Sequence, residues 1–220
     1  MYYACLTPPW FFKWDILFDF LFLCVAFLIS AFAFTIYRKI EQSNVKTFSI
    51  SFFFIGLSYL SQTLINGYIF THIGNGICGY LALEHLNFIS FIGISAHLFF
   101  MLLGLSILVY TTLQSREPKI LYLLLGGSLT AILLSRNRIS TFFILSALYF
   151  TLITWHFMDN AFKKKQKNTL LIAISFLILT LGWIGFLFTS YSPLFYVTGK
   201  LLELIAFILI FWNYRLLRKK

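Results

Sequence analysis

Charged residues are scarce in this sequence. Only 11% of its 220 residues are charged, whereas soluble domains carry about 25%. The connections between its apolar stretches are too short for a soluble catalytic domain, which needs roughly 50 residues or more. This shortage of charge excludes an ordinary soluble enzyme and confines any activity to helices within a membrane or to their short loops.

Catalytic and metal-binding motifs are also missing. The sequence has no Gly-x-Ser-x-Gly and no His-Glu-x-x-His, and membrane hydrolases need a nucleophile with a base, or a metal cluster, inside the helix bundle. The segment "THIGNGICGYLALEHLNF" contains His72, Cys78, Glu84 and His85, but their spacing matches no recurring zinc pattern. We therefore expect a glycine-rich turn and an interfacial helix there, and no catalytic residues, metal or cofactor.

Long apolar runs dominate what is present. Hydrophobic residues make up 60% of the chain. We predict seven transmembrane helices, at about residues 16–37, 48–70, 89–113, 120–134, 139–155, 169–188 and 194–212. A crossing needs about 20 residues, so six spans qualify and the fourth is short. The expected fold is an all-α polytopic bundle forming a single transmembrane domain over residues 1–220, with no soluble domain.

The first span could also be a cleaved signal peptide. Its apolar run is too long for one, it contains Asp19, and no basic region precedes it. We therefore expect this span to be a retained helix.

Basic residues are unevenly distributed between the connections. With seven crossings, thirteen of the 17 lie on one side and three on the other, while Lys200 falls within a span. The thirteen are Arg38, Lys39, Lys46, Arg116, Lys119, Lys163, Lys164, Lys165, Lys167, Arg215, Arg218, Lys219 and Lys220, and the three are Lys13, Arg136 and Arg138. Without a fourth crossing the same counting gives seven against nine. Because short basic loops stay cytoplasmic, we predict seven crossings with the amino terminus outside and the carboxyl terminus inside.

The fourth span can cross despite its length. Pro118 lies in its first turn, where a missing N–H has no consequence, and Lys119 can extend toward the membrane surface. We expect a multi-pass protein of the cell membrane.

The densest basic clusters, "KKKQK" and "RLLRKK", lie next to the predicted cytoplasmic surface. There they attract anionic lipid headgroups at roughly 1 kcal/mol per basic residue. The headgroup-binding residues that we predict are Lys163, Lys164, Lys165, Arg218, Lys219 and Lys220. Alternatively the clusters only determine topology, or they bind a cytoplasmic partner. A second membrane protein or another copy of the chain is a further candidate partner, and no nucleic acid is expected.

Cysteine occurs three times. Cys24 falls within the first span, where a thiol is a small apolar filler. Cys5 and Cys78 are both external under the predicted topology, where an oxidising environment permits a disulfide. The alternative is two free thiols that never approach within the bridging distance of about 7 Å between Cα atoms.

The last span carries two ionisable residues. In "FYVTGKLLELIAF", residues 195–207, Lys200 and Glu203 are three positions apart and share one helix face. Charges at such depth cost about 2.5–3.5 kcal/mol each on insertion scales, so they need partners. The other spans offer Asp15, Asp19, Ser58, Gln62, Asn66, Ser90 and His97. We predict a polar cluster, opening outward between the first, second, third and seventh helices, that contains Lys200, Glu203, His97, Gln62, Asn66 and Asp19.

Three interpretations of this cluster remain open. In the first, Lys200 and Glu203 form a structural ion pair, and the neighbouring amides and His97 hold the helices together at about 0.6 kcal/mol per hydrogen bond. In the second, the cluster is a pocket in which Lys200 meets an anionic ligand and Glu203 or His97 forms a hydrogen bond with it. In the third, it belongs to an ion or proton path. Few ionisable groups continue such a path inward before His156 and Asp159.

The function that we predict is a sensor-like or binding module with an outward-facing polar site. The alternatives are a scaffolding subunit of a membrane complex and a small-ion or proton permease. Catalysis is disfavoured because no constellation of catalytic residues is present.

Small residues predict two close helix contacts. Gly127 and Ala131 form a small-xxx-small pair in the fourth span, and Gly182 and Gly185 lie on one side of the sixth.

Two strings in the carboxyl-terminal third, "FMDNAFKKKQKNTLLIAISFLILTLGW" and "LFYVTGKLLELIAFILIFWNYRLLRKK", resemble small seven-helix membrane proteins of archaea. The resemblance implies a seven-helix fold and no particular activity. A lysine in the last of seven helices is also a feature of microbial rhodopsins, where it forms a retinal Schiff base. Here the match covers only "VTGKLLEL", Tyr196 replaces a carboxylate four residues before Lys200, and the third span lacks that family's Arg and Asp, so we exclude retinal.

Overall fold

The computed structural model describes the chain except residues 1–6, 9, 74–83, 114–116, 165–166 and 219–220, and it leaves out the side chains of 72–73, 84–90, 164, 167–168 and 214–218. The described residues form an all-α protein of seven helices. They are α1 (Phe12–Ile40), α2 (Ser43–Ile73), α3 (Glu84–Thr112), α4 (Pro118–Leu134), α5 (Arg138–Lys164), α6 (Lys167–Leu187) and α7 (Leu194–Arg218). Six of them are long and apolar enough to cross a membrane, and α4 is shorter. The chain is therefore a multi-pass membrane protein.

The seven predicted helices are all present, but several are longer than predicted. Helix α1 begins at Phe12 rather than 16, and α5 continues to Lys164 rather than 155. Hydropathy detects the apolar part of a span, whereas backbone hydrogen bonds continue through the polar residues at either end. Helix α4 begins with Pro118 in its first turn, as predicted.

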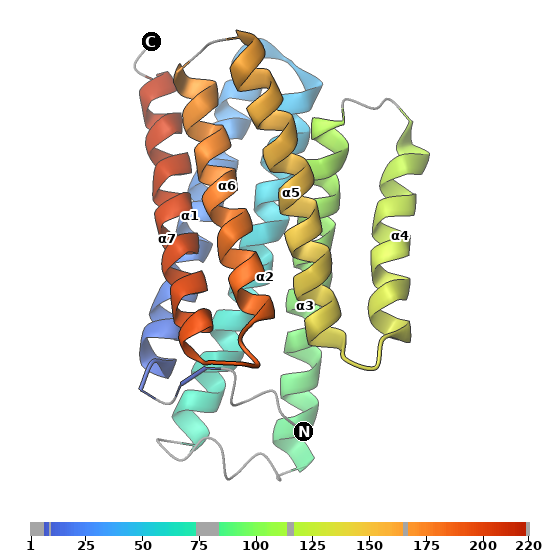
Figure 1. Ribbon diagram of the computed structural model, residues 1–220, viewed down its shortest axis with the longest axis vertical. Helices are drawn as coiled ribbons and strands as arrows, with labels where there is room; N and C mark the ends of the chain where they lie inside the picture. The colour runs from blue at the N-terminus through green and yellow to red at the C-terminus, as the bar shows by residue number, and fades with distance from the viewer. Residues whose placement is uncertain (1–6, 9, 74–83, 114–116, 165–166, 219–220) are drawn as a thin grey trace.

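The chain runs up and down through the bundle, so that each helix is antiparallel to the next (Figure 1). Six helices form a closed ring in the order α1, α2, α3, α5, α6, α7, and α4 packs outside it against α3 and α5. Helices α1–α3 and α5–α7 thus form two three-helix halves, and the corresponding helices of the two halves, α1 and α5, α2 and α6, α3 and α7, run in the same direction. The halves meet along two seams, α1 against α7 and α3 against α5.

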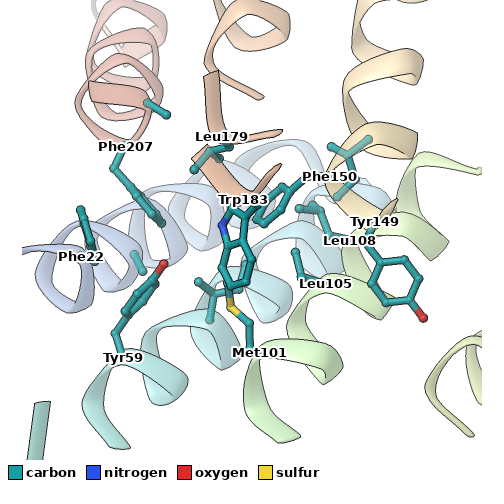
Figure 2. Packing of buried hydrophobic residues seen from close by; sticks show 14 of the residues in the cluster. Phe22, Tyr59, Met101, Leu105, Leu108, Tyr149, Phe150, Leu179, Trp183 and Phe207 are labelled. Carbon is teal, nitrogen blue, oxygen red and sulfur yellow. The ribbon is translucent and has the colours of Figure 1, made fainter. Parts of the chain in front are cut away.

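Apolar side chains fill the interior of the ring. Trp183 lies at the centre of this core, with Met101, Leu105 and Phe150 around it (Figure 2). Large apolar side chains also cover much of the outer surface, among them Leu123, Ile144 and Phe188. An exposed apolar exterior is expected of helices that face lipid rather than water.

Glycines set the close approach of α6 to α7. A Cβ at Gly182 would lie 3.0 Å from the carbonyl oxygen of Gly199, and a Cβ at Gly199 would lie 2.6 Å from the Phe186 ring. The close helix contact predicted for the glycines of α6 is therefore confirmed at Gly182. No helix of this chain approaches α4 at Gly127, because a Cβ there would meet nothing within 4 Å, so a close contact at this position stays a prediction for another subunit. That part of α4 faces away from the ring.

Candidate functional site

Four ionisable side chains are buried together at the seam between α1 and α7. Lys200 is 4% exposed, Asp15 1%, Asp19 0% and Glu203 2%. The Lys200 Nζ lies 2.5 Å from Asp19 Oδ1 and 3.3 Å from Asp15 Oδ1. Asp15 and Asp19 are one helical turn apart on α1, so both face the same ammonium group. Burying such charges is costly unless each is paired and hydrogen-bonded.

Both aspartates also accept hydrogen bonds from neutral side chains. Asn66 Nδ2 of α2 donates to Asp19 Oδ2 at 3.0 Å. The Tyr196 hydroxyl of α7 donates to Asp15, with 3.0 and 2.9 Å to its two carboxyl oxygens, and Thr7 Oγ1 lies 3.3 Å from Asp15 Oδ2. Hydrogen bonds to charged groups are about twice as strong as neutral ones, so these donors fix both carboxyl groups in place.

Glu203 is bound by a different partner from the one predicted. The Tyr59 hydroxyl of α2 donates to Glu203 Oε1, whereas the ammonium of Lys200 forms its ion pairs with the two aspartates. Lys200 and Glu203 share a face of α7 but form no ion pair within 4.0 Å, so the interpretation as a structural Lys200–Glu203 pair is wrong. The aspartates of α1 lie nearer to the ammonium and satisfy it.

The indole of Trp183 also approaches Glu203. Its Nε1 is buried and lies beside the carboxyl group without meeting the geometry of a hydrogen bond to any described residue. Figure 2 shows this nitrogen on the side of the ring that faces Tyr59 and Phe207. A donor is therefore available next to a carboxyl group that already accepts from Tyr59.

His97 lies beside the cluster rather than within it. Its Nδ1 is 2.7 Å from Ser58 Oγ and 3.1 Å from the Ser58 carbonyl oxygen, and Ser58 Oγ donates to the His97 carbonyl at 3.0 Å. These bonds join α2 to α3. The imidazole packs against Tyr59 and Phe142, with ring centroids 6.3 and 5.6 Å away. His97 therefore binds α3 to α2, the helix that carries Tyr59, next to that residue.

The structure brings together only part of the predicted set. Asp19, Asn66 and Lys200 form one network, Glu203 lies next to it, and His97 lies one layer away. Gln62 is half-buried on α2 and is not among the described residues that bond to the network. Phe11, which is buried, packs edge-on against Tyr196 with ring centroids 6.5 Å apart, and the predicted outward opening stays a prediction.

Two tyrosines in the cluster were not predicted as site residues. Tyr196 lies four positions before Lys200, on the same face of α7. Tyr59 lies seven positions before Asn66, on the same stripe of α2. The helical spacing could have identified both, but the sequence holds 28 Phe and 12 Tyr, and an aromatic ring on a buried face is no signal by itself.

Carboxyl groups outnumber cations in this cluster. Three buried carboxyl groups share the cluster with one ammonium, which pairs with the two aspartates, so the fully ionised network has two more negative charges than positive ones. The predicted anionic ligand is disfavoured, because the aspartates already neutralise Lys200. The described residues contain no group of three or more His, Cys, Asp and Glu arranged to hold a metal ion. Carboxyl groups can also bind and release protons.

The other predicted sites lie mostly outside the described part of the chain. Cys5 and Cys78 are not among the described residues, and Cys24 is a half-buried free thiol. Of the predicted headgroup-binding residues, Lys163 is exposed and pairs with Asp159 at 2.6 Å. Nothing is described of Lys165, Lys219 and Lys220, nor of the side chains of Lys164 and Arg218.

Comparison with protein-family models, with curated proteins and with solved structures found no match for this chain.

Proposed function

We propose that this chain is a sensor-like membrane protein whose buried cluster binds and releases protons. One observation carries the proposal, namely three carboxyl groups buried in one cluster with a single ammonium, all at most 4% exposed. Ionisable residues within membrane helices mark functional sites, and chains of carboxylates are used as proton relays. A proton on one of these carboxyl groups removes one of the two excess negative charges without needing space for a ligand.

The arrangement of donors supports the same proposal. Tyr59 donates to Glu203, the unbonded indole N–H of Trp183 lies beside the same carboxyl group, and Tyr196 and Asn66 donate to the aspartates. The hydroxyl of a tyrosine can donate to a carboxylate and can also accept from a protonated carboxyl group. The network can therefore keep its hydrogen bonds when a proton arrives or leaves.

We further propose seven crossings, with the amino terminus outside and the carboxyl terminus in the cytoplasm. The distribution of basic residues, thirteen on one side against three on the other, supports this topology. The direction of α4, which runs back along α3 before α5 begins, agrees with a fourth crossing (Figure 1). This orientation places Asp15 and Lys200 toward the outer side of the membrane and the exposed Lys163 among cytoplasmic headgroups.

Infrared titration of the reconstituted protein tests proton binding directly. A protonated carboxylic acid has a carbonyl band that a carboxylate lacks, so we expect this band to appear as the pH is lowered. Asp19→Asn and Glu203→Gln should each reduce the band. Asp159→Asn is the matched control, because Asp159 is exposed and lies outside the cluster. A band that does not change with pH, or that survives both cluster substitutions, would show that the cluster is not the proton-binding site.

A second candidate function, as a subunit of a membrane complex, is favoured by the position of α4. Its Gly126 and Gly127 face open space, and the neighbouring Leu123 and Leu133 are exposed. Small residues on an apolar face permit close approach of another transmembrane helix. Purification in a mild detergent tests this role, since a subunit brings a stoichiometric partner that Gly127→Leu should release.

A further inference from the structure

Asn213, near the end of α7, is the most unusual buried residue outside the cluster. It is 0% exposed, and neither Nδ2 nor Oδ1 has a hydrogen-bond partner among the described residues. Buried amides in proteins are nearly always satisfied, by protein groups or by ordered water. A water molecule at the Asn213 amide would satisfy both of its polar atoms.

Asn213 lies on the same buried stripe of α7 as the cluster. The stripe continues from Glu203 through Phe207 and Ile210 to Asn213, at spacings of three and four residues. Ten residues of helix separate Glu203 from Asn213, which is about 15 Å along the axis. The stripe is polar at both ends and apolar between them.

The buried stripe of α1 repeats this pattern. It begins with Asp15 and Asp19, continues through Phe22 and Ala26, and reaches Ser30, which bonds to Ser49 of α2. Helices α1 and α7 run in the same direction and meet at one seam. The seam therefore has an outer charged layer, an apolar middle layer and an inner polar layer.

Aromatic rings form the middle layer. Phe22 and Phe207 are stacked, with ring centroids 5.4 Å apart, and Tyr59 meets Phe207 edge-on at 5.9 Å. Figure 2 shows these three rings together, one from each of α1, α7 and α2. Phe22 also lies against the ammonium of Lys200, 5.5 Å from its ring centroid. Two packed rings exclude water, so this layer separates the cluster from Asn213.

The bonds of the cluster join the two halves of the bundle. Lys200 binds Asp19, Tyr196 binds Asp15 and Glu203 binds Tyr59, and each bond links α7 to α1 or α2. Protonation of an aspartate removes its charge and weakens its attraction to Lys200. The protonation state of the cluster thus affects how firmly the seam is held beside Phe22.

We propose that the seam between α1 and α7 is a gated proton path and that the Phe22–Phe207 layer is its gate. The cluster takes a proton from the outer end onto a carboxylate oxygen. When the rings separate, water joins Glu203 to Asn213, and the proton leaves the Glu203 O–H bond along this water to the inner end. The carboxylate is then protonated again from outside, so each cycle moves one proton. This inference rests on proton binding by the cluster.

Proton flux into liposomes tests the gate. Purified protein is reconstituted with a pH-sensitive dye inside, and a potassium gradient with valinomycin drives the uptake of protons. Phe207→Ala should raise the flux several-fold over that of the unmodified protein. Phe207→Leu keeps most of the apolar volume but removes the stacked ring, and it should give a smaller rise if the alanine variant does not fold. Adding Asn213→Leu or Glu203→Gln should abolish the rise.

The matched control is Phe157→Ala. Phe157 stacks on Phe176 with centroids 5.1 Å apart, but the pair lies between α5 and α6, away from the seam. Its loss should leave the flux unchanged. A folded Phe207 variant with unchanged flux, or a rise that persists with Glu203→Gln, would overturn the gate. An infrared band that titrates without any flux would overturn the gate alone, whereas the absence of that band would overturn both proposals.

Discussion

Lys200 Nζ and Asp19 Oδ1 lie 2.5 Å apart although the two residues are 181 positions apart in the sequence. Their bond closes the ring of helices at the seam where the first helix meets the last. A charged pair in such a place is weak evidence for stability, because desolvation offsets much of the attraction. Replacing only one of the two partners has a much larger effect, because it leaves the other charge buried without a counter-charge.

We expect Lys200→Met to lower the free energy of unfolding by about 3–5 kcal/mol, because it leaves two buried aspartates without their cation. Adding Asp19→Asn should recover part of this loss, since one stranded charge is then removed. Thermal or denaturant unfolding in detergent measures both effects, combined as a double-mutant cycle.

The exposed pair of Lys163 and Asp159 provides the comparison for this cycle. It is an i, i+4 pair at the other end of the bundle, and both side chains are at least half exposed. Exposed pairs contribute about 0–1 kcal/mol, so Lys163→Met and Asp159→Asn should change little. Equal effects at the two sites would contradict the buried position of Lys200.

Tyr59→Phe should destabilise the protein by about 1–3 kcal/mol, because it leaves the buried Glu203 without its donor. Tyr149→Phe is the matched control, since the Tyr149 hydroxyl donates to a backbone carbonyl, that of Leu124, at 2.9 Å. The loss at Tyr149 should be smaller because no ionisable partner is stranded. Unfolding in detergent compares the two variants, and the opposite order would show that Tyr59 is not a main partner of Glu203.

Gly199→Ala should separate α6 from α7, because the new Cβ would lie 2.6 Å from the Phe186 ring and 3.0 Å from the Gly182 carbonyl oxygen. Overpacking of this kind costs about 1–3 kcal/mol. Gly127→Ala, where the Cβ meets nothing within 4 Å, should instead leave stability equal or slightly higher. The melting temperatures of the two variants test this opposite behaviour, and a loss at both would refute the packing of α4.

Trp183 should report on the cluster by fluorescence. The other four tryptophans, Trp10, Trp14, Trp155 and Trp212, are exposed on the bundle surface. With those four replaced by Phe, the emission of Trp183 should change as Glu203 gains or loses a proton beside its indole. The change should disappear in Glu203→Gln. Emission that is constant with pH would show that the carboxyl group does not titrate next to the indole.

The helices could be predicted from the sequence, and their order around the ring could not. Apolar runs bounded by charge identified all seven helices, because a bilayer demands about 20 apolar residues per crossing. Nothing in those runs determined that α3 would neighbour α5 or that α4 would stay outside. Those choices depend on the shapes of many apolar side chains at once.

The candidate site was predictable only where a residue type is rare. Asp19, Asn66 and Lys200 were identified because polar groups within membrane spans need partners, and the structure brings them together. Their binding role stays a prediction. Tyr59 and Trp183 were not identified, since aromatic residues make up 20% of the chain and fill both its core and its surface.

Helix α4 contributes no residue to the charged cluster, and the ring closes without it. It nevertheless returns the chain to the end of the bundle at which α3 began (Figure 1). If the chain passed from α3 straight into α5, helices α5, α6 and α7 would all run in the opposite sense. Lys200 would then lie at the far end of the bundle from Asp19. Helix α4 lies outside the ring, yet by adding one more pass along the bundle it sets the direction of α7. That direction brings Lys200 to the same end of the bundle as Asp19.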